Sequence, residues 1–331
     1  MFRLQIYSFF RNNTCVIVIF LLLLQRIYIM NAQMKKFSIR EACAKKAVRW
    51  GLLAVILLSI IAAGIVWHKA EIRRQAMTMA ELQVDTMALR ITDCLGNIEQ
   101  ATHEMEPVIT ANLQPDSLLV YTRRVVERHP DIKGCSITME PDFFKTLGHN
   151  FSAYSVREGD SIATVIEGDY DYYSKEWYYY PREKGKPVWV DPYDDFNAGT
   201  LSSTELIASY SVPLYDTARK LVGVIATDIA LPTLAKVVAG STPFPGAYWM
   251  VTGKKGNYLV YPDKERLVYH TIFDGVNPRF QPDIIKLGRD MIDGHYGYSS
   301  VDFDGEKCLV FYRPLKQAGW SIALICPERH M

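Results

Sequence analysis

The sequence predicts an α+β protein in which an N-terminal transmembrane helix and a long stalk helix precede two tandem modules built on antiparallel sheets. One observation is an uncharged apolar run over residues 50–67, and another is a long stretch with few helix breakers directly behind it. The third is a change of texture from Asp131 onward, where short segments alternate between apolar and polar residues with period two. A cluster of Gly, Pro and Ser at residues 240–246 divides these segments into two sets.

The apolar run at residues 50–67, WGLLAVILLSIIAAGIVW, spans roughly 27 Å as a helix at about 1.5 Å per residue, so it can cross a bilayer. The alternative is a buried core helix. It is disfavoured by a tryptophan at each end of the run and by the basic segment 34–49, in which Glu41 is the sole acid. The positive-inside rule places segment 34–49 in the cytoplasm and everything after His68 outside the cytoplasmic membrane.

Residues 1–33 form a doubtful leader whose apolar part, TCVIVIFLLLL at residues 14–24, is short for a membrane span. Three interpretations compete: a first membrane helix, the apolar region of a signal-like segment, or translation from an upstream start with Met34 as the true one. We favour the last. The topology of the remaining chain is the same in each case, because a hairpin of two helices would also keep the basic loop inside.

The stalk helix is expected over residues 69–113, about 65 Å at 1.5 Å per residue, with Pro107 kinking it near its far end. An apolar stripe lies on one of its faces: Ile91, Leu95, Ile98, Met105 and Ile109. A long helix with such a stripe is typical of a stalk or dimerisation element, so a homodimer through this helix is a further expectation. Asp116 and Ser117 have the residue types of a cap for a second helix that ends at Arg128.

The two modules are expected at residues 114–240 and 241–328. The first contains its two clearest strands in ELIASYSVPLYD and KLVGVIATDIAL, followed by a helix over residues 231–238. The second has strands on both sides of the turn GKKGN, a helix around residues 282–290 and three further strands. Cys308 and Cys326 lie symmetrically about a turn and are candidates to face each other across a hairpin, although two small core residues would give the same pattern.

Several functional classes are disfavoured by composition and motifs. The 37 basic and 36 acidic residues nearly balance, which argues against a nucleic-acid partner. The stretch HEMEP lacks the second histidine of a zinc-protease helix, GKKGN is no phosphate loop, and DPYDDFNAG does not have EF-hand spacing. The cysteines show no metal-ligand spacing. The sequence therefore predicts no catalytic residue, metal site or cofactor.

Residues 171–193, DYYSKEWYYYPREKGKPVWVDPY, combine eight aromatic rings with many charges, a mixture found neither in ordinary cores nor in ordinary loops. This stretch either forms a strand-and-turn surface or lines a pocket. We expect Tyr179, Tyr180 and Trp189 to pack structurally. Asp228 interrupts an apolar neighbourhood, where a lone carboxylate is costly without a partner. It is a candidate both for ligand contact and for the N-cap of the helix that follows.

Four of these stretches carry a family resemblance. They are YYSKEWYYYPREKGKPVWVDPY, LVGVIATDIAL, YWMVTGKKGNYLVYPD and FYRPLKQAGWSIAL. Over about residues 69–327 the chain resembles the double Cache (dCache) extracytoplasmic sensor domains of bacterial transmembrane receptors. The resemblance implies a membrane-distal and a membrane-proximal PAS-like (Cache) module. It also implies a single-pass protein of the bacterial inner membrane whose sensor domain is periplasmic.

The resemblance extends to a ligand pattern of amino-acid-sensing members. The matching residues here are Tyr170, Lys175, Trp177, Tyr178, Tyr193 and Asp228, in that order. It implies that Asp228 and Tyr170 hold a ligand ammonium, while Lys175, Trp177 and Tyr178 hold a carboxylate. Lys175 stands where arginine is usual, and a lysine lacks the two-pronged fork that matches a carboxylate. The ligand class therefore stays open between an amino acid, an amine and a small organic acid.

The function that follows is a membrane-anchored sensor that binds a small ligand in the distal module for signal transduction. The alternatives are a scaffold or interaction protein of the cell envelope that binds no ligand, and a truncated remnant of a receptor kinase or phosphatase. Resembling receptors continue into a second membrane helix and a cytoplasmic domain, whereas this sequence stops at CPERHM. We therefore expect either truncation or signalling through a separate cytoplasmic or membrane partner.

Overall fold

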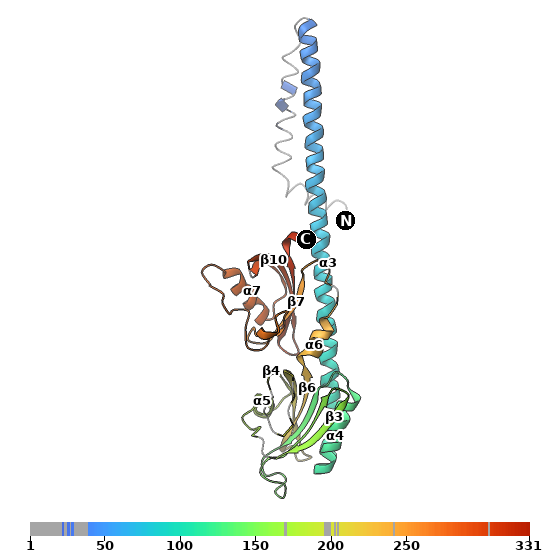
Figure 1. Cartoon of the computed structure of the whole chain (residues 1–331), viewed down its shortest axis with the longest axis vertical. Coiled ribbons are helices and arrows are strands. Elements are labelled where there is room, and N and C mark those ends of the chain that lie inside the picture. The colour runs from blue at the N-terminus through green and yellow to red at the C-terminus, as the bar shows by residue number, and fades with distance from the viewer. Residues whose placement is uncertain are drawn as a thin grey trace. The chain divides into compact units, whose positions relative to one another are not determined.

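The structure is a computed structural model of the chain (Figure 1). It describes residues 39–331 except 169–170, 195–199, 202, 204, 241 and 304, together with residues 22, 25, 26, 28 and 29. The chain divides into two units, Met1–Arg74 and Gln75–Met331. The predicted leader lies almost wholly outside the described residues. The α+β class, with a long apolar helix and two antiparallel sheets, is confirmed.

The N-terminal unit contains the first half of helix α3 (Ile39–Ala111). In the described part of the chain, this is the one helix long and apolar enough to cross a membrane, and its apolar window is wholly unburied. Trp50 and Trp67, which bracket the predicted span, are both exposed. The helix is continuous from the basic segment through the predicted span, because no proline lies in residues 39–67.

In the second unit, α3 buries one face. The predicted apolar stripe is on that face: Ile91, Leu95, Ile98 and Ile109 are buried and Met105 is partly buried. Pro107 lies inside the helix, which ends one turn later at Ala111. Helix α4 (Pro115–Arg128) follows, with Gln114 at its N-cap. The predicted cap by Asp116 and Ser117 is wrong, because Pro115 already occupies the first turn, where its missing N–H costs nothing.

The first sheet has six antiparallel strands in the order β3-β2-β1-β6-β5-β4. The strands are β1 (Gly134–Met139), β2 (Ser152–Glu158), β3 (Ser161–Glu167), β4 (Val188–Tyr193), β5 (Ile207–Tyr215) and β6 (Leu221–Ala230). Helix α6 (Leu231–Val238) follows β6 as predicted. Helix α5 (Glu176–Lys184), within the aromatic stretch, was not predicted; it ends at Gly185, whose positive φ of 60° permits the left-handed turn.

The two faces of this sheet have different partners. The back face, which carries Ile137, Tyr210 and Ile225, joins the core that includes the α3 stripe. The front face carries Val190, Val224 and Ala226, which cluster with aromatic residues of α5 and of the loop before it. Figure 1 accordingly shows α3 and α5 on opposite sides of the sheet. The front face is therefore the one that contacts α5 and the loop before it, within the charged aromatic stretch.

The second sheet has five antiparallel strands in the order β8-β7-β11-β10-β9. Its elements are β7 (Tyr248–Thr252), β8 (Tyr258–Val260), η1 (Lys264–Arg266), α7 (Pro282–Ile292), β9 (Gly297–Phe303), β10 (Glu306–Leu315), β11 (Trp320–Pro327) and η2 (Glu328–His330). Helix α7 packs on one face through Ile284, Leu287 and Met291. The other face joins the same core as α3.

Cys308 and Cys326 do not face each other, so of the two alternatives left open by the sequence the structure has the second, two small core residues. The register opposes Cys308 to Pro327 and Leu309 to Cys326, which places the two thiols on opposite faces of the sheet. Cys308 lies in the cluster beneath α7 and Cys326 in the α3 core, and both are free.

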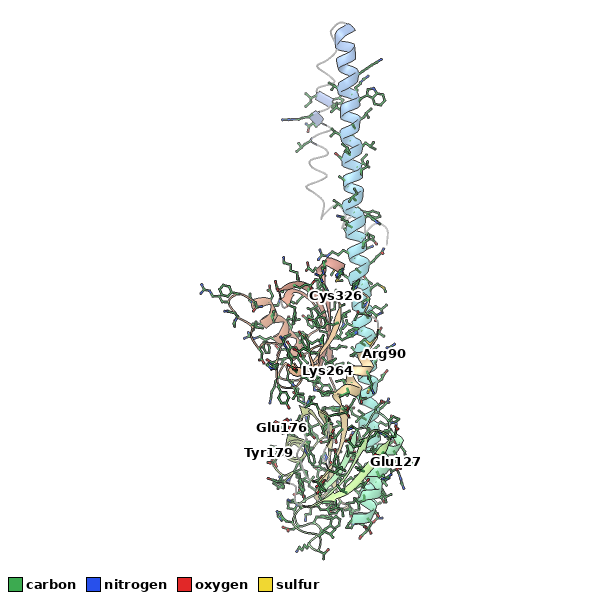
Figure 2. All side chains as sticks on the ribbon, viewed as in Figure 1. Arg90, Glu127, Glu176, Tyr179, Lys264 and Cys326 are labelled. Carbon is green, nitrogen blue, oxygen red and sulfur yellow. The ribbon has the colours of Figure 1, made fainter. Side chains whose placement is uncertain are left out.

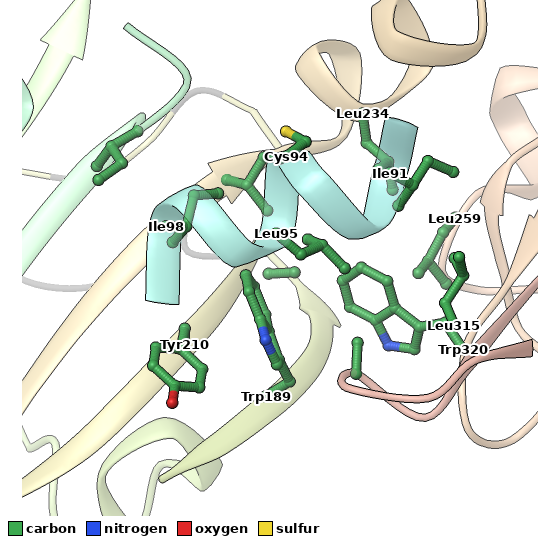
Figure 3. Close-up of a cluster of buried hydrophobic side chains, with 14 of the residues drawn as sticks. Ile91, Cys94, Leu95, Ile98, Trp189, Tyr210, Leu234, Leu259, Leu315 and Trp320 are labelled. Carbon is green, nitrogen blue, oxygen red and sulfur yellow. The ribbon is translucent and has the colours of Figure 1, made fainter. Parts of the chain in front are cut away.

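One buried cluster brings the two sheets together on α3 (Figure 3). Trp189 of the first sheet and Trp320 of the second have ring centroids 5.6 Å apart. Both rings lie against the helix segment that carries Ile91, Leu95 and Ile98. Trp320 Nε1 also donates to Asp191 Oδ1 of β4 at 2.9 Å. Lys254, in the turn between β7 and β8, also donates from its backbone N–H to Asp191 Oδ2 at 3.0 Å and from Nζ to Trp189 O at 2.5 Å. The two sheets of the second unit are therefore held together by aromatic burial and by several polar contacts to β4.

Candidate functional site

Asp228 lies inside β6 and caps no helix. The backbone of this residue is paired with Gly134 on one side and Ser209 on the other, and α6 begins three residues later with Ala230 at its N-cap. The predicted N-cap role is therefore wrong, since the strand continues past the aspartate. Its side chain is 4% exposed on the front face, where Oδ1 accepts a hydrogen bond from Ser209 Oγ at 2.6 Å.

Gly134 makes room for this carboxylate. A Cβ atom at residue 134 would lie 2.7 Å from Asp228 Oδ2 and 2.9 Å from the hydroxyl of Tyr154. Both distances are shorter than real Cβ contacts allow, so a side chain there would displace the carboxylate, the tyrosine or both. In the sequence, Gly134 is only a glycine at the start of a predicted strand. Its neighbours Asp228 and Tyr154 are set by strand register, which the sequence did not reveal.

Hydroxyl groups continue from Asp228 across the front face. The Tyr193 hydroxyl is 2.8 Å from Ser209 Oγ, so Tyr193, Ser209 and Asp228 form one chain of hydrogen bonds. Ser136 and Ser211 flank Ala226 in the adjacent row, and both are buried. Ser211 Oγ has no hydrogen-bond partner among the described residues. Small polar side chains thus line this part of the front face, and the Ser211 hydroxyl among them is available for a further hydrogen bond.

The electrostatics of Asp228 are those of a carboxylate without a cation. Burial raises its pKa to about 6, and the hydrogen bond from Ser209 offsets part of that rise. No ion pair reaches Asp228 from the residues that the structure describes. The group is therefore ionised at neutral pH in a site that disfavours charge, which is the arrangement that a cationic ligand would relieve.

Aromatic rings cover this part of the front face. Tyr172, Trp177 and Tyr178 are buried in a cluster with front-face residues, and Tyr193 packs at its edge. The Tyr178 hydroxyl donates to Glu140 Oε1 at 2.7 Å, and Arg182 Nε donates to the same oxygen at 3.0 Å. Burial and Glu140 raise the pKa of Tyr178, so it remains a neutral donor. Its ring contributes to the cluster while its hydroxyl is committed elsewhere.

The predicted site residues divide into those brought together and those not. Tyr193 and Asp228 share the hydrogen-bond chain, and Trp177 and Tyr178 share the aromatic cluster. Lys175 is the N-cap of α5 and is exposed. Tyr170 lies outside the described residues. The residues that sequence reasoning missed are Gly134, Tyr154, Ser209 and Ser211, whose proximity to Asp228 comes from strand pairing.

The remaining aromatics of the stretch have separate roles. Trp189 points to the back face and is buried, as expected of a packing residue. Tyr180 is partly buried and donates to Glu176 at 3.1 Å. Tyr179 is 45% exposed and lies near Glu176 on the outer side (Figure 2), so the expectation that it packs is wrong. Its position in α5 directs it away from the sheet, which strand-based reasoning could not foresee.

A second buried carboxylate anchors the loop between β4 and β5. Glu167 ends β3 on the front face, and its two oxygens accept backbone N–H groups of Thr200 at 2.6 Å and Leu201 at 2.7 Å. Strands β3 and β4 are opposite edges of the sheet, so these two bonds tie the loop that follows β4 to the other edge strand. Lys133 Nζ pairs with Glu205 Oε2 of the same loop at 2.9 Å.

Replacing Gly134 by alanine tests the close packing around Asp228. We expect Gly134→Ala to destabilise the full chain by about 1–3 kcal/mol, because the new methyl group overlaps the carboxylate and the Tyr154 hydroxyl. Denaturant unfolding measures the change. Gly168→Ala is the matched control, since nothing lies within 4 Å of a Cβ at that residue. Equal costs for the two variants would show that the carboxylate is not confined as described.

Comparison with known proteins finds similarity to sensor domains of receptors. Residues 118–236 match the first PDC sensor domain of methyl-accepting chemotaxis protein-like proteins. Among solved structures, the fold is similar to the extracellular domain assigned to the histidine kinase mmHK1S-Z3 (TM-score 0.62, 20% identity, 78% of this chain and 94% of that chain). It is also similar to the periplasmic sensory domain of the Campylobacter jejuni chemoreceptor Tlp1 (TM-score 0.63, 13% identity, 76% and 95%).

A third similar structure contains a ligand. It is the ligand-binding domain of the Pseudomonas aeruginosa amino acid chemoreceptor PctB in complex with L-Gln (TM-score 0.55, 18% identity, 76% of this chain and 90% of that chain). At these identities the likeness concerns the fold. The matched family is sensory and not catalytic, and a sensor fold with an apolar helix favours a membrane-anchored receptor. The chain therefore shares the fold of these sensor domains, and residues 118–236 of its first module match the first PDC sensor domain of the family model.

Proposed function

We propose that the first module, residues 114–240, binds a small organic cation, an amino acid or a primary amine, whose ammonium group pairs with Asp228. The observation that carries this proposal is a buried carboxylate whose hydrogen-bond partner among the described residues is the neutral hydroxyl of Ser209, on the sheet face that also carries the aromatic cluster. An ammonium beside aromatic faces gains roughly 0.5–2 kcal/mol per good contact. Trp177 and Tyr193 are the rings that we propose to contact the ammonium.

The ammonium is the essential part of the proposed ligand, and a carboxylate is secondary. Lys175 is exposed at the start of α5 and offers a single point charge in place of a two-pronged fork. The solved PctB domain is in complex with L-Gln or L-Arg, and the similar Campylobacter jejuni Tlp3 domain with L-norvaline. These amino acids support an amine-bearing ligand here, with Lys175 on its acidic end, the Tyr178 ring beside it and Tyr170 near the ammonium.

The proposed setting is the bacterial inner membrane. Residues 50–67 span it once, residues 34–49 are cytoplasmic, and the modules at 114–240 and 241–328 are periplasmic. The stalk, residues 69–113, pairs with a second copy of the chain, because Met79, Leu82, Thr86 and Leu89 follow a heptad spacing and the three apolar members are exposed. A separate cytoplasmic or membrane partner receives the signal.

A thermal-shift screen of the full chain in lipid nanodiscs tests the function. The compounds are L-amino acids, primary amines and small carboxylic acids without an amine, each tested on the wild-type chain and on Asp228→Ala. We expect amine-bearing compounds to raise Tm in the wild type only, since a ligand at about 100 times its Kd stabilises by about 2.7 kcal/mol. Stabilisation by amine-free acids in both proteins would contradict the proposal. No stabilisation by any compound would favour the envelope scaffold.

A further inference from the structure

Two neighbouring rows of residues cross β4, β5 and β6, one on each face of the sheet. The front row is Val190, Ser209 and Asp228, and the back row is Trp189, Tyr210 and Thr227, each row joined by direct strand pairing. Successive side chains of a strand point to opposite faces. Each member of the back row is therefore the chain neighbour of a member of the candidate ligand site.

Every member of the back row is hydrogen-bonded to the same turn of α3. Trp189 Nε1 donates to Glu99 Oε1 at 2.7 Å, the Tyr210 hydroxyl is 2.9 Å from His103 Nε2, and the Thr227 and Thr102 hydroxyls are 2.7 Å apart. The three helix residues are spaced i, i+3 and i+4, so they lie on one face. Figure 3 shows Trp189 and Tyr210 side by side beneath this helix.

These polar contacts lie within an otherwise apolar interface. Thr102 and Thr227 are fully buried, and their neighbours on the helix include Leu95 and Ile98. Replacing both partners of a buried hydrogen bond by apolar groups of the same shape can be nearly neutral, so the bond between Thr102 and Thr227 can be removed without a large loss of stability. The three bonds do set the position of the helix: a shift by one turn, about 5.4 Å, would break all three together.

We propose that the back row, Trp189, Tyr210 and Thr227, transmits the state of the ligand site to α3. This inference rests on the proposed function, because ligand binding at Asp228 is the event that would move the front-row residues. A ligand ammonium competes with Ser209 for the carboxylate, and movement of β5 or β6 at this row carries Tyr210 and Thr227 with it. Because their partners occupy one turn of α3, the helix responds as a unit.

Hydrogen exchange read by mass spectrometry on the full chain in nanodiscs tests this transmission. The probe is a mixture of the twenty proteinogenic L-amino acids. Exchange is followed in β6 and α5, which report the site, and in residues 95–105 of α3. The row variants are Thr102→Val/Thr227→Val and, separately, Tyr210→Phe. The control is Thr110→Val, whose hydroxyl donates to carbonyl oxygens of its own helix, Glu106 O and Pro107 O.

In the wild type and in Thr110→Val, we expect the probe to change exchange at the site and in residues 95–105 by about fivefold, the lower end of ordinary allosteric coupling. In the row variants the response at the site persists and the response of the helix is lost. A helix response that survives in the row variants would overturn the inference, as would a wild-type site response without a helix response. Either result would leave the proposed function intact.

A ligand-free arm covers the case in which no amino acid binds. Asp228→Asn removes the front-row charge, and we expect it to change exchange in residues 95–105 of the otherwise wild-type chain. The same substitution should leave that segment unchanged in the Thr102→Val/Thr227→Val background. An unaltered helix in both backgrounds would overturn the inference. A helix change without any probe response would support it while counting against the proposed ligand class.

Discussion

Replacing Asp228 by asparagine is expected to stabilise the unliganded protein and to abolish ligand binding. Asparagine keeps the oxygen that accepts from Ser209 Oγ and removes the buried charge. With a folded-state pKa of about 6 against an ordinary value near 3.9, ionisation of Asp228 opposes folding above pH 6. We expect Asp228→Asn to raise the free energy of unfolding by about 1–3 kcal/mol at pH 7.5 in denaturant titrations.

The sign of the pH dependence gives a further check on the same variant. The folded state holds the Asp228 proton more tightly than the unfolded chain does, so the group's contribution to stability is greatest near pH 4 and is lost as pH rises to about 6. The free energy of unfolding of Asp228→Asn relative to the wild type should therefore increase as the pH rises across that interval. Asp216, which accepts two turn N–H groups at 2.9 Å, is the control, and Asp216→Asn should not stabilise. Destabilisation by Asp228→Asn would make this aspartate a structural residue.

Truncating Trp320 is expected to give the largest loss of stability. Its buried indole packs on Trp189 of the other sheet, and its N–H donates to Asp191 Oδ1. Trp320→Ala should cost about 3–5 kcal/mol, because it opens a cavity in the shared core and removes one of the two N–H groups that donate to the Asp191 carboxylate, the other being the backbone N–H of Lys254. Thermal unfolding of the full chain measures this loss.

Two comparison variants separate the contributions to that loss. Trp320→Phe retains most of the ring volume and removes the N–H, so it should cost less than Trp320→Ala. Phe280→Ala, at a side chain that is 77% exposed, should change the free energy of unfolding by no more than about 0.5 kcal/mol. If Trp320→Ala cost as little as Phe280→Ala, the shared core would not hold the two sheets together.

Much of the fold could be predicted because its signals are local. β5 and β6 were the two clearest strands in the sequence, and the proline at the start of α6 marked the helix that follows them. The apolar stripe of α3 was visible from spacing alone. Helix α5 was missed because aromatic residues favour strands, and its tight end at Gly185 carried too little weight in a region rich in tyrosine.

The candidate site was predicted only in part because its partners are distant in the sequence. Tyr193 and Asp228 were named, but Gly134 and Ser209 meet Asp228 through the pairing of β1, β6 and β5. The same limit left the arrangement of Cys308 and Cys326 open, since a register offset of one residue moves Cys326 to the other face. The N-cap assignment failed because β6 continues two residues beyond Asp228 before the helix begins.

The pH dependence of ligand affinity tests the central claim, recognition of an ammonium by the Asp228 carboxylate. The measurement is a calorimetric titration of the full chain with the first amine-bearing compound that the screen identifies, at pH 7.5 and pH 5. Because the pKa of Asp228 is about 6, protonation should weaken binding at pH 5 by about tenfold. Equal affinity at both values, or tighter binding at pH 5, would contradict a site built on this carboxylate.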